Sequence, residues 1–284
     1  MGNLKSLRLR IKSIKSTQKI TKAMQMVSSS KLRQVRSALE AFKGYYVASS
    51  DIMSSIRGFW KEEKTRIEEL LFNATPSKAC VAIVVTSDRG LCGSFNQSIL
   101  RVTLSDFRQM RSKGIEFSVI TVGKNGRDAL ISNGFADNII LHLPSSSGIP
   151  TTSTSAIYEK LIELLDSELY DSCKLYFNSF KNSTTNVPTV KSLIPVDTTS
   201  LGGDYESDGE GLIEEIAKIY IDSQIYWGLL DSKVSEEAAR MMAMDNATRN
   251  AGDMITKLTL LLNRSRQTSI TSELIEIISG AEAL

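Results

Sequence analysis

The sequence has 284 residues and a net charge of +2, and its hydrophobic (42%) and charged (23%) fractions exclude a disordered or low-complexity chain. No apolar run approaches the roughly 18 residues of a membrane helix, so no direct membrane span is expected. Charge is concentrated at one end. Residues 1–43 hold eleven basic side chains and one acidic one, a net charge of +10, and the other 241 residues carry −8.

The residue types that carry most catalytic and metal chemistry are scarce. The three cysteines lie far apart and His142 is the one histidine, so they cannot form a four-ligand zinc site. His142 alternates with apolar residues before a proline, which favours a strand-end residue over a catalytic base. We therefore expect no catalytic residue, no metal site and no bound cofactor.

A long helix is predicted from Asn3, a plausible N-cap, to about Arg57, because this segment lacks proline. Apolar residues recur in it at the 3.5-residue spacing of a coiled coil, namely at Leu4, Leu7, Ile11, Ile14, Leu32, Val35, Leu39, Phe42 and Tyr46. Between the two runs the same frame turns polar, at Gln18, Thr21, Gln25 and Ser28. The apolar residues of that stretch occupy a shifted face, at Ile20, Met24 and Val27. Either the coiled coil has a local stutter, or this face meets something other than the helical partner.

A second long helix is predicted from about Gly211 to the C-terminus. Positions taken every three or four residues from Ile213 to Ser272 are apolar at twelve of eighteen places. The polar positions cluster at the end of this series, at Ser265, Ser269 and Ser272. At about 1.5 Å per residue such a helix reaches on the order of 100 Å, so it must pair with the first helix, project, or both. Residues 210–284 carry twelve acids and seven bases, which favours pairing with the basic first helix. Two separate helices in a bundle are the alternative.

The middle of the sequence predicts an α/β domain. The continuous β-branched run Ala79–Thr86 predicts a buried, parallel strand. Four more strands, alternating with helices, are indicated at Ile115–Val122, Ile139–Leu143, Ser172–Phe180 and Val187–Val196. Helices are expected up to Lys113, within Gly123–Gly134 and over Ala156–Tyr170, after a loop over Pro144–Ser155. Pro188 and Pro195 place the last strand at an edge of the sheet. We expect helices on both faces of the sheet and three domains: 1–75, 76–197 and 198–284.

The loop Ser87–Asn96 follows the first strand, where a phosphate-binding loop would lie. It lacks the GxxxxGK[ST] and GxGxxG patterns, so a structural turn is favoured over an anion site at Gly90 and Gly93. Cys92 is interpreted as a small turn residue, with a reactive thiol beside Arg89 as the alternative.

Three blocks of sequence carry a family resemblance: IKSIKSTQKITKAMQMVSSSKLR (11–33), TSDRGLCGSFN (86–96) and RMMAMDNAT…NRSRQTSITSELIEIISGAEAL (240–284). In this order and spacing they resemble the γ subunit of F-type ATP synthases. The resemblance implies an antiparallel, left-handed coiled coil of the two terminal helices and a central Rossmann-like domain. It also implies that the basic first helix is part of the mature chain rather than an import signal.

The family's role is that of a non-catalytic rotor shaft. It turns inside a ring of three α and three β subunits, beside the ε subunit, and couples ion flow through the membrane c-ring to the β-subunit catalytic sites. The resemblance therefore implies α, β, ε and c-ring partners, without nucleic acid. It places the chain at the cytoplasmic face of a bacterial cell membrane, or alternatively at the matrix side of the mitochondrial inner membrane.

Individual contacts are carried over by resemblance. Met24, Arg240, Arg266 and Gln267 correspond to contacts with β subunits. Tyr205 and Glu206 fall where the foot meets the c-ring and ε, although DYESDGE lacks the family's usual proline there. Two other functions are alternatives. A basic coiled coil can bind nucleic acid, but the first 41 residues contain no aromatic side chain, and a nucleotide-binding α/β enzyme lacks a phosphate loop.

Overall fold

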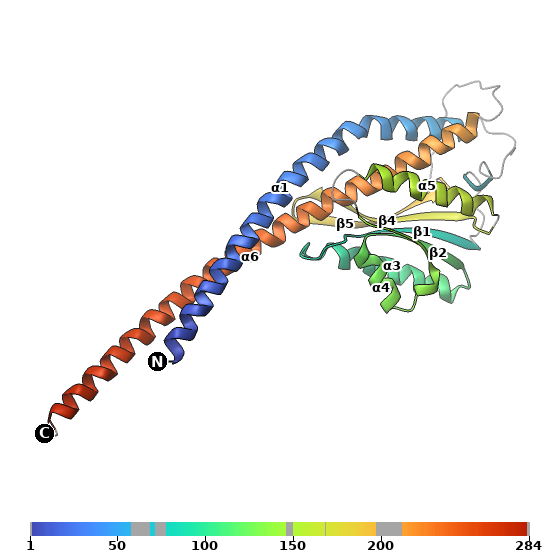
Figure 1. Ribbon diagram of the computed structural model, residues 1–284. Helices are drawn as coiled ribbons and strands as arrows, with labels where there is room; N and C mark the ends of the chain where they lie inside the picture. Colours follow the sequence, from blue (N-terminus) through green and yellow to red (C-terminus); the bar gives the residue numbers. More distant parts are fainter. Residues whose placement is uncertain are drawn as a thin grey trace. The chain divides into compact units, whose positions relative to one another are not determined.

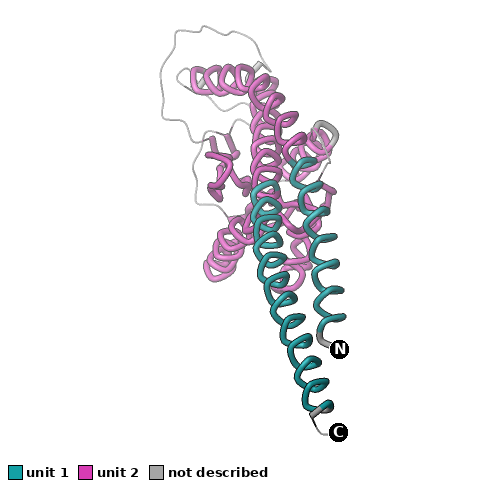
Figure 2. Tube along the Cα trace, turned by 90° about the vertical axis from the view of Figure 1, so that its left-hand side faces the viewer, with its two compact units in different colours: residues 1–28, 241–284 teal, residues 29–240 magenta. Residues whose placement is uncertain are grey.

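The computed structural model describes residues 2–57, 69–71, 78–145, 150–167, 169–196 and 212–282. Its elements, labelled in Figure 1, are α1 (Gly2–Arg57), β1 (Ala79–Val85), α3 (Phe95–Ser112), β2 (Glu116–Val122), α4 (Lys124–Ser132), η1 (Ala136–Asn138), β3 (Ile139–Leu143), α5 (Thr151–Asp166), β4 (Ser172–Asn182), β5 (Thr185–Ile194) and α6 (Leu212–Glu282). The chain divides into two compact units, coloured in Figure 2. Unit 1 contains residues 1–28 and 241–284, and unit 2 contains residues 29–240.

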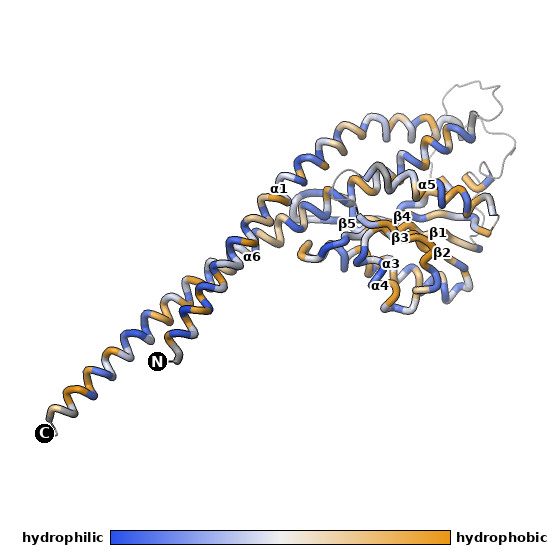
Figure 3. The backbone as a smooth tube through the Cα atoms, in the orientation of Figure 1, coloured by the Kyte–Doolittle hydropathy of each residue, from blue (hydrophilic) through white to orange (hydrophobic). Residues whose placement is uncertain are grey.

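A five-stranded sheet lies at the centre of unit 2, in the order β3-β2-β1-β4-β5. β1 to β4 run parallel, and β5 pairs antiparallel with β4. β5 lies at one edge of the sheet, the position that Pro188 and Pro195 predict. β1 is buried at all seven residues because helices cover both faces of the sheet. Figure 1 shows α3 and α4 on one face and α5 on the other, and Figure 3 shows the central strands in hydrophobic colours. The expected α/β class is confirmed.

The two cores of the sheet follow from strand alternation. On β1, Val81, Ile83 and Val85 point into the core that includes α5 and α6. The residues between them, Cys80, Ala82 and Val84, point into the core that includes α3 and α4. A parallel strand buried on both faces has no solvent side, which is why its sequence is continuously apolar.

The boundaries of α5 differ from the sequence prediction. The helix begins at Thr151 and ends at Asp166, whereas the sequence predicts a loop for the serine- and threonine-rich stretch up to Ser155. The hydroxyl group and the N–H of Thr154 both donate to the Pro150 carbonyl, at 2.9 and 3.3 Å, so this polar stretch bonds within the helix. Helix α1 likewise already includes Gly2, so Asn3 is not its N-cap.

Within unit 2, α1 and α6 pair antiparallel through apolar and aromatic residues. Val35 packs against Leu230 and Val234, all at most 1% exposed. Farther along α1, the rings of Phe42 and Tyr226 meet edge to face at 4.6 Å, and those of Tyr46 and Trp227 stack at 4.3 Å. Among the described residues, no helix combines the length and the apolar character needed to cross a membrane.

Candidate functional site

The loop after β1 is folded around one side chain, Ser87. Its hydroxyl group donates to the Arg89 carbonyl at 2.8 Å and accepts from Nδ2 of Asn96 at 2.8 Å. Its N–H donates to Oδ1 of Asn96 at 3.0 Å. The thiol of Cys92 lies 3.6 Å from the same hydroxyl group, and Cys92 is only 2% exposed. This packing supports the structural-turn interpretation of the loop and of Cys92.

The N-terminus of α4, where an anion could be held, is filled by the protein's own oxygen atoms. The carboxylate of Asp88 accepts from the N–H of Lys124 at 2.9 Å, and the hydroxyl group of Thr86 accepts from the N–H of Gly126 at 2.9 Å. Gly123 has φ of +93°, and a Cβ added there would lie 2.2 Å from the Thr86 carbonyl oxygen. The glycine is therefore required for packing of the two turns.

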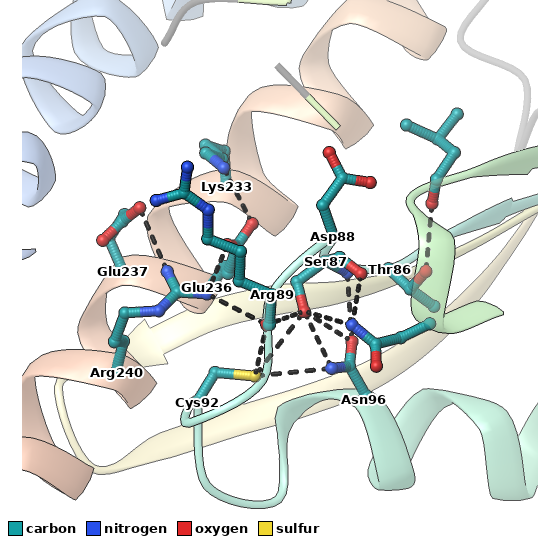
Figure 4. Close-up of polar contacts among 12 residues, drawn as sticks. Thr86, Ser87, Asp88, Arg89, Cys92, Asn96, Lys233, Glu236, Glu237 and Arg240 are labelled. Carbon is teal, nitrogen blue, oxygen red and sulfur yellow. Dashed lines mark hydrogen bonds and ion pairs between the residues drawn. The ribbon is translucent and has the colours of Figure 1, made fainter. Parts of the chain in front are cut away.

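A ladder of buried charges on α6 meets this loop, as Figure 4 shows. Arg240 donates to Glu236 at 2.7 Å and pairs with Glu237 at 3.1 Å, and Lys233 donates to Glu236 at 2.9 Å. Arg240 also donates to the Arg89 carbonyl at 3.3 Å. Burial by itself lowers the pKa of the Arg240 guanidinium, but the two carboxylates outweigh burial and raise this pKa. The ladder therefore ties α6 to the loop after β1 with a permanent positive charge.

Three more hydrogen bonds connect the same stretch of α6 to the sheet. Asp231 accepts from the hydroxyl group of Ser179 at 2.8 Å and from the N–H of Phe180 at 2.9 Å, at the end of β4. Burial raises the pKa of Asp231, and these two hydrogen bonds lower it by less. On β5, Nδ2 of Asn186 donates to the Ser235 carbonyl at 3.4 Å.

Unit 1 contains an antiparallel pairing of a different chemistry. Thr21 and Thr248 share a hydrogen bond of 2.8 Å between their hydroxyl groups, and Gln25 donates to Asp245 at 2.8 Å. Gln18 donates to the Thr248 carbonyl at 3.3 Å. These polar residues occupy the same heptad positions as the apolar residues before and after them, and they still face α6. The heptad spacing is therefore continuous, and the stutter interpretation is wrong.

The apolar residues of that stretch point outward instead. Ile20 is 58% exposed, Met26 61% and Val27 56%. Met24 beside them is half-buried. This arrangement agrees with the second interpretation of the sequence, in which this face of α1 is available to something other than α6.

A 480 Å³ pocket lies elsewhere in unit 2, between α1, β5 and Tyr220 of α6. Its cation is already engaged, because Nζ of Lys191 donates to the Tyr46 hydroxyl group at 2.7 Å and also to Gln224. Within the described ranges, no three His, Cys, Asp or Glu side chains gather in a way that could hold a metal ion. His142 sits in β3, with Nδ1 3.0 Å from the Thr121 hydroxyl group.

The structure separates the residues singled out from the sequence. Arg240 is buried at the end of unit 2, while Met24, Arg266 and Gln267 belong to unit 1, where the last two are exposed. Tyr205 and Glu206 lie outside the described residues. Sequence reasoning missed the partners of Arg240, which are Lys233, Glu236 and Glu237. Their one sequence signal is charge spacing of three and four residues, which is equally common on exposed helices.

Comparison with known proteins gives consistent matches over the whole chain. The family model for ATP synthase matches residues 3–284. Curated relatives include the ATP synthase gamma chains of Rickettsia felis and Rickettsia prowazekii, each 43% identical over 289 aligned residues that cover all of both chains.

Solved structures give similar results. A chain of the Tetrahymena thermophila mitochondrial ATP synthase central stalk and c-ring matches with a TM-score of 0.62 and 28% identity, over 80% of this chain and 99% of that chain. A chain of the Euglena gracilis mitochondrial ATP synthase in rotational state 3 shares the fold, with a TM-score of 0.65 and 18% identity over 99% of this chain and 94% of that chain.

Proposed function

The chain belongs to the ATP synthase γ-chain family, and from that premise we propose that it is the central rotor shaft of the F1 sector. The observation that carries this proposal is the 71-residue helix α6, which runs through both units and pairs antiparallel with α1 in each. Hydrogen-bonded backbone along the full length of a helix resists twisting and bending. A paired helix of this length is suited to transmitting rotation rather than to building an active site.

In this role the chain is a non-catalytic subunit whose partners are α, β, ε and the c-ring. Ion flow turns the c-ring, the shaft turns with it, and its changing surface alters the β-subunit sites in sequence. A ligand or surface shifts a conformational equilibrium only by its differential contacts with the states, so the shaft must present different faces at different angles. We do not retain the nucleic-acid alternative, since the family match includes the basic helix.

We propose Met24, Arg266 and Gln267 as contacts with the β subunits. Support for Met24 comes from the exposed apolar residues around it, Ile20 and Val27, which α6 does not cover. Arg266 and Gln267 are exposed on α6. An exposed apolar face flanked by basic residues suits a partner surface that combines apolar and acidic side chains.

Arg240 is proposed as a contact of a different kind. Because it is 8% exposed and already paired with Glu236, an acidic β-subunit loop would have to compete for its guanidinium. Tyr205 and Glu206 are proposed as contacts with the c-ring and the ε subunit by resemblance alone.

We also propose the functional division into 1–75, 76–197 and 198–284. The proposed location is the cytoplasmic face of a bacterial cell membrane, which the Rickettsia relatives favour.

Co-expression with the α, β and ε subunits of the same organism tests the proposal. The expected result is a stable complex that hydrolyses ATP, while the chain alone does not. Steady ATP hydrolysis by the isolated chain, or failure to co-purify with an α–β assembly that forms without it, would contradict the rotor function.

A further inference from the structure

Helix α6 is enclosed by unit 2 over one short stretch. Every residue from Gly228 to Ala238 is buried, around the full circumference of the helix. At the start of this stretch the helix lies against β4, and a Cβ added to Gly228 would come within 2.4 Å of Cδ2 of Leu175. Arg240 stands at the end of the stretch, where unit 2 ends.

Five charged side chains lie within or at the end of this enclosed stretch, each at most 8% exposed: Asp231, Lys233, Glu236, Glu237 and Arg240. Buried ion pairs are poor stabilisers, because desolvation offsets most of their attraction and apolar residues of similar size often do as well. The cluster is also incompletely satisfied, since Oε2 of Glu237 has no hydrogen-bond partner among the described residues. Maximal stability is therefore a poor explanation for these charges.

Their geometry offers a better explanation. Apolar packing already restricts the angle of α6, since a side chain larger than glycine at position 228 would collide with Leu175. Hydrogen bonds and ion pairs add directional contacts to this fit. Glu236 and Glu237 lie on α6 itself and orient the guanidinium of Arg240. Its hydrogen bond to the Arg89 carbonyl crosses to the α/β domain and therefore depends on the angle of the helix. Asp231 adds a second fixed point at the end of β4.

We propose that Arg240, oriented by Glu236 and Glu237, is a torsional joint. Its hydrogen bond to the loop after β1, together with the contacts of Asp231 with β4, fixes the rotational angle of α6 against the α/β domain and carries the load between domain and shaft. Glu236 and Glu237 are then positioning residues, acting through Arg240 on the loop after β1. This inference rests on the proposed rotor function and assigns Arg240 an internal role in addition to any partner contact.

The test is Glu236→Gln in the assembled complex, with Glu214→Gln as the matched control. Both residues pair with a base four positions along α6, but the Glu214–Lys218 pair is exposed, with side chains 35% and 46% accessible. Glu236 is too buried to meet another subunit, so its effect is internal. We expect the ratio of ion-driven ATP synthesis to uncoupled hydrolysis to fall several-fold in Glu236→Gln, because a neutral amide holds the Arg240 guanidinium less firmly than a carboxylate does.

Arg240→Lys is a second variant, which keeps the charge but loses the planar fork, and it should lower the same ratio. If Glu236→Gln does not assemble, the ratio measured for Arg240→Lys tests the proposal. The proposed joint is contradicted if either assembled variant has the same ratio of synthesis to hydrolysis as Glu214→Gln. A wild-type complex that never forms or never couples would instead contradict the rotor function itself. A lower melting temperature with an unchanged ratio would make the ladder merely structural.

Discussion

The same two helices pair in both units, but apolar and polar contacts have different shares in each. In unit 2 the α1–α6 seam is mainly apolar and aromatic, as at Val35 and Leu230, with one buried hydroxyl pair between Ser49 and Ser223. In unit 1 the frame continues through hydroxyl and amide side chains, as at Thr21 and Thr248. An apolar seam supplies most of the stability, whereas a polar position in a coiled coil specifies register at a cost in stability. The contacts of unit 2 therefore hold the two helices together, whereas the polar contacts of unit 1 mainly set their register.

This difference has a functional counterpart. The polar stretch of unit 1 leaves Ile20 and Val27 outside the seam, exposed and uncovered by α6. In unit 2, by contrast, α6 is enclosed on all sides before Arg240. A rotor needs one part fixed to its domain and another free to meet moving partners, and the two units satisfy these needs separately.

The largest expected effect comes from the apolar seam. Leu230→Ala removes a fully buried side chain, 0% exposed, and should lower the free energy of unfolding by about 3 kcal/mol. Urea denaturation of the purified chain measures it. Leu260→Ala, at a position 66% exposed, is the control and should stay within about 0.5 kcal/mol of wild type. Equal losses in the two variants would contradict the assignment of the seam.

Substitutions in the polar seam of unit 1 should lower the free energy of unfolding less than Leu230→Ala does, and their effects should not be additive. Thr21→Val removes one partner of the hydroxyl pair and should cost about 1 kcal/mol. Adding Thr248→Val removes the other partner, so the double variant should recover most of this loss, because two apolar side chains of the same shape pack together. A double-mutant cycle from denaturation curves checks the prediction, and strictly additive losses would contradict it.

Asp231 provides a smaller, pH-dependent effect in unit 2. Its pKa is raised in the folded chain mainly by burial, so its contribution to stability is present below the unfolded pKa and is lost as the pH rises through the folded pKa. Asp231→Asn cannot ionise and should lack this loss. The variant's stability relative to wild type should therefore increase upward from about pH 4. A stability difference between Asp231→Asn and wild type that stays constant with pH would contradict the raised pKa of Asp231.

The smallest effect on stability is expected on the exposed face of unit 1. Ile20→Ala with Val27→Ala should change the unfolding free energy by less than about 0.5 kcal/mol, because both side chains are largely exposed. The same variant should weaken ATP hydrolysis by the assembled complex, since this face is proposed to meet the β subunits. Unchanged hydrolysis would remove the face from the proposed contacts.

Much of the fold could be predicted from sequence periodicity. The frame that starts at Ile213 places Leu230, Val234 and Met244 on the seam, and all three are buried. Periodicity does not show whether the polar residues of α1 face α6 or the solvent. Thr21 and Gln25 are as plausible on a surface as in a seam until their partners, more than 200 residues away, are known.

The ladder at Arg240 was missed for a related reason. Glu236 and Arg240 have the spacing of an ordinary exposed ion pair, and the pattern does not reveal that the sheet and α1 enclose this stretch. The sequence predicts the loop after β1 as a turn, but its connection to α6 depends on a main-chain carbonyl, that of Arg89. A backbone acceptor has no signature in the sequence.

Direct observation of rotation tests the central claim. The three natural cysteines are buried, so Lys113→Cys introduces a single exposed thiol on the α/β domain for attachment of a probe. With the α and β subunits fixed to a surface, addition of ATP should turn the probe in steps in one direction. A complex that hydrolyses ATP while the probe stays at one angle would contradict the rotor account.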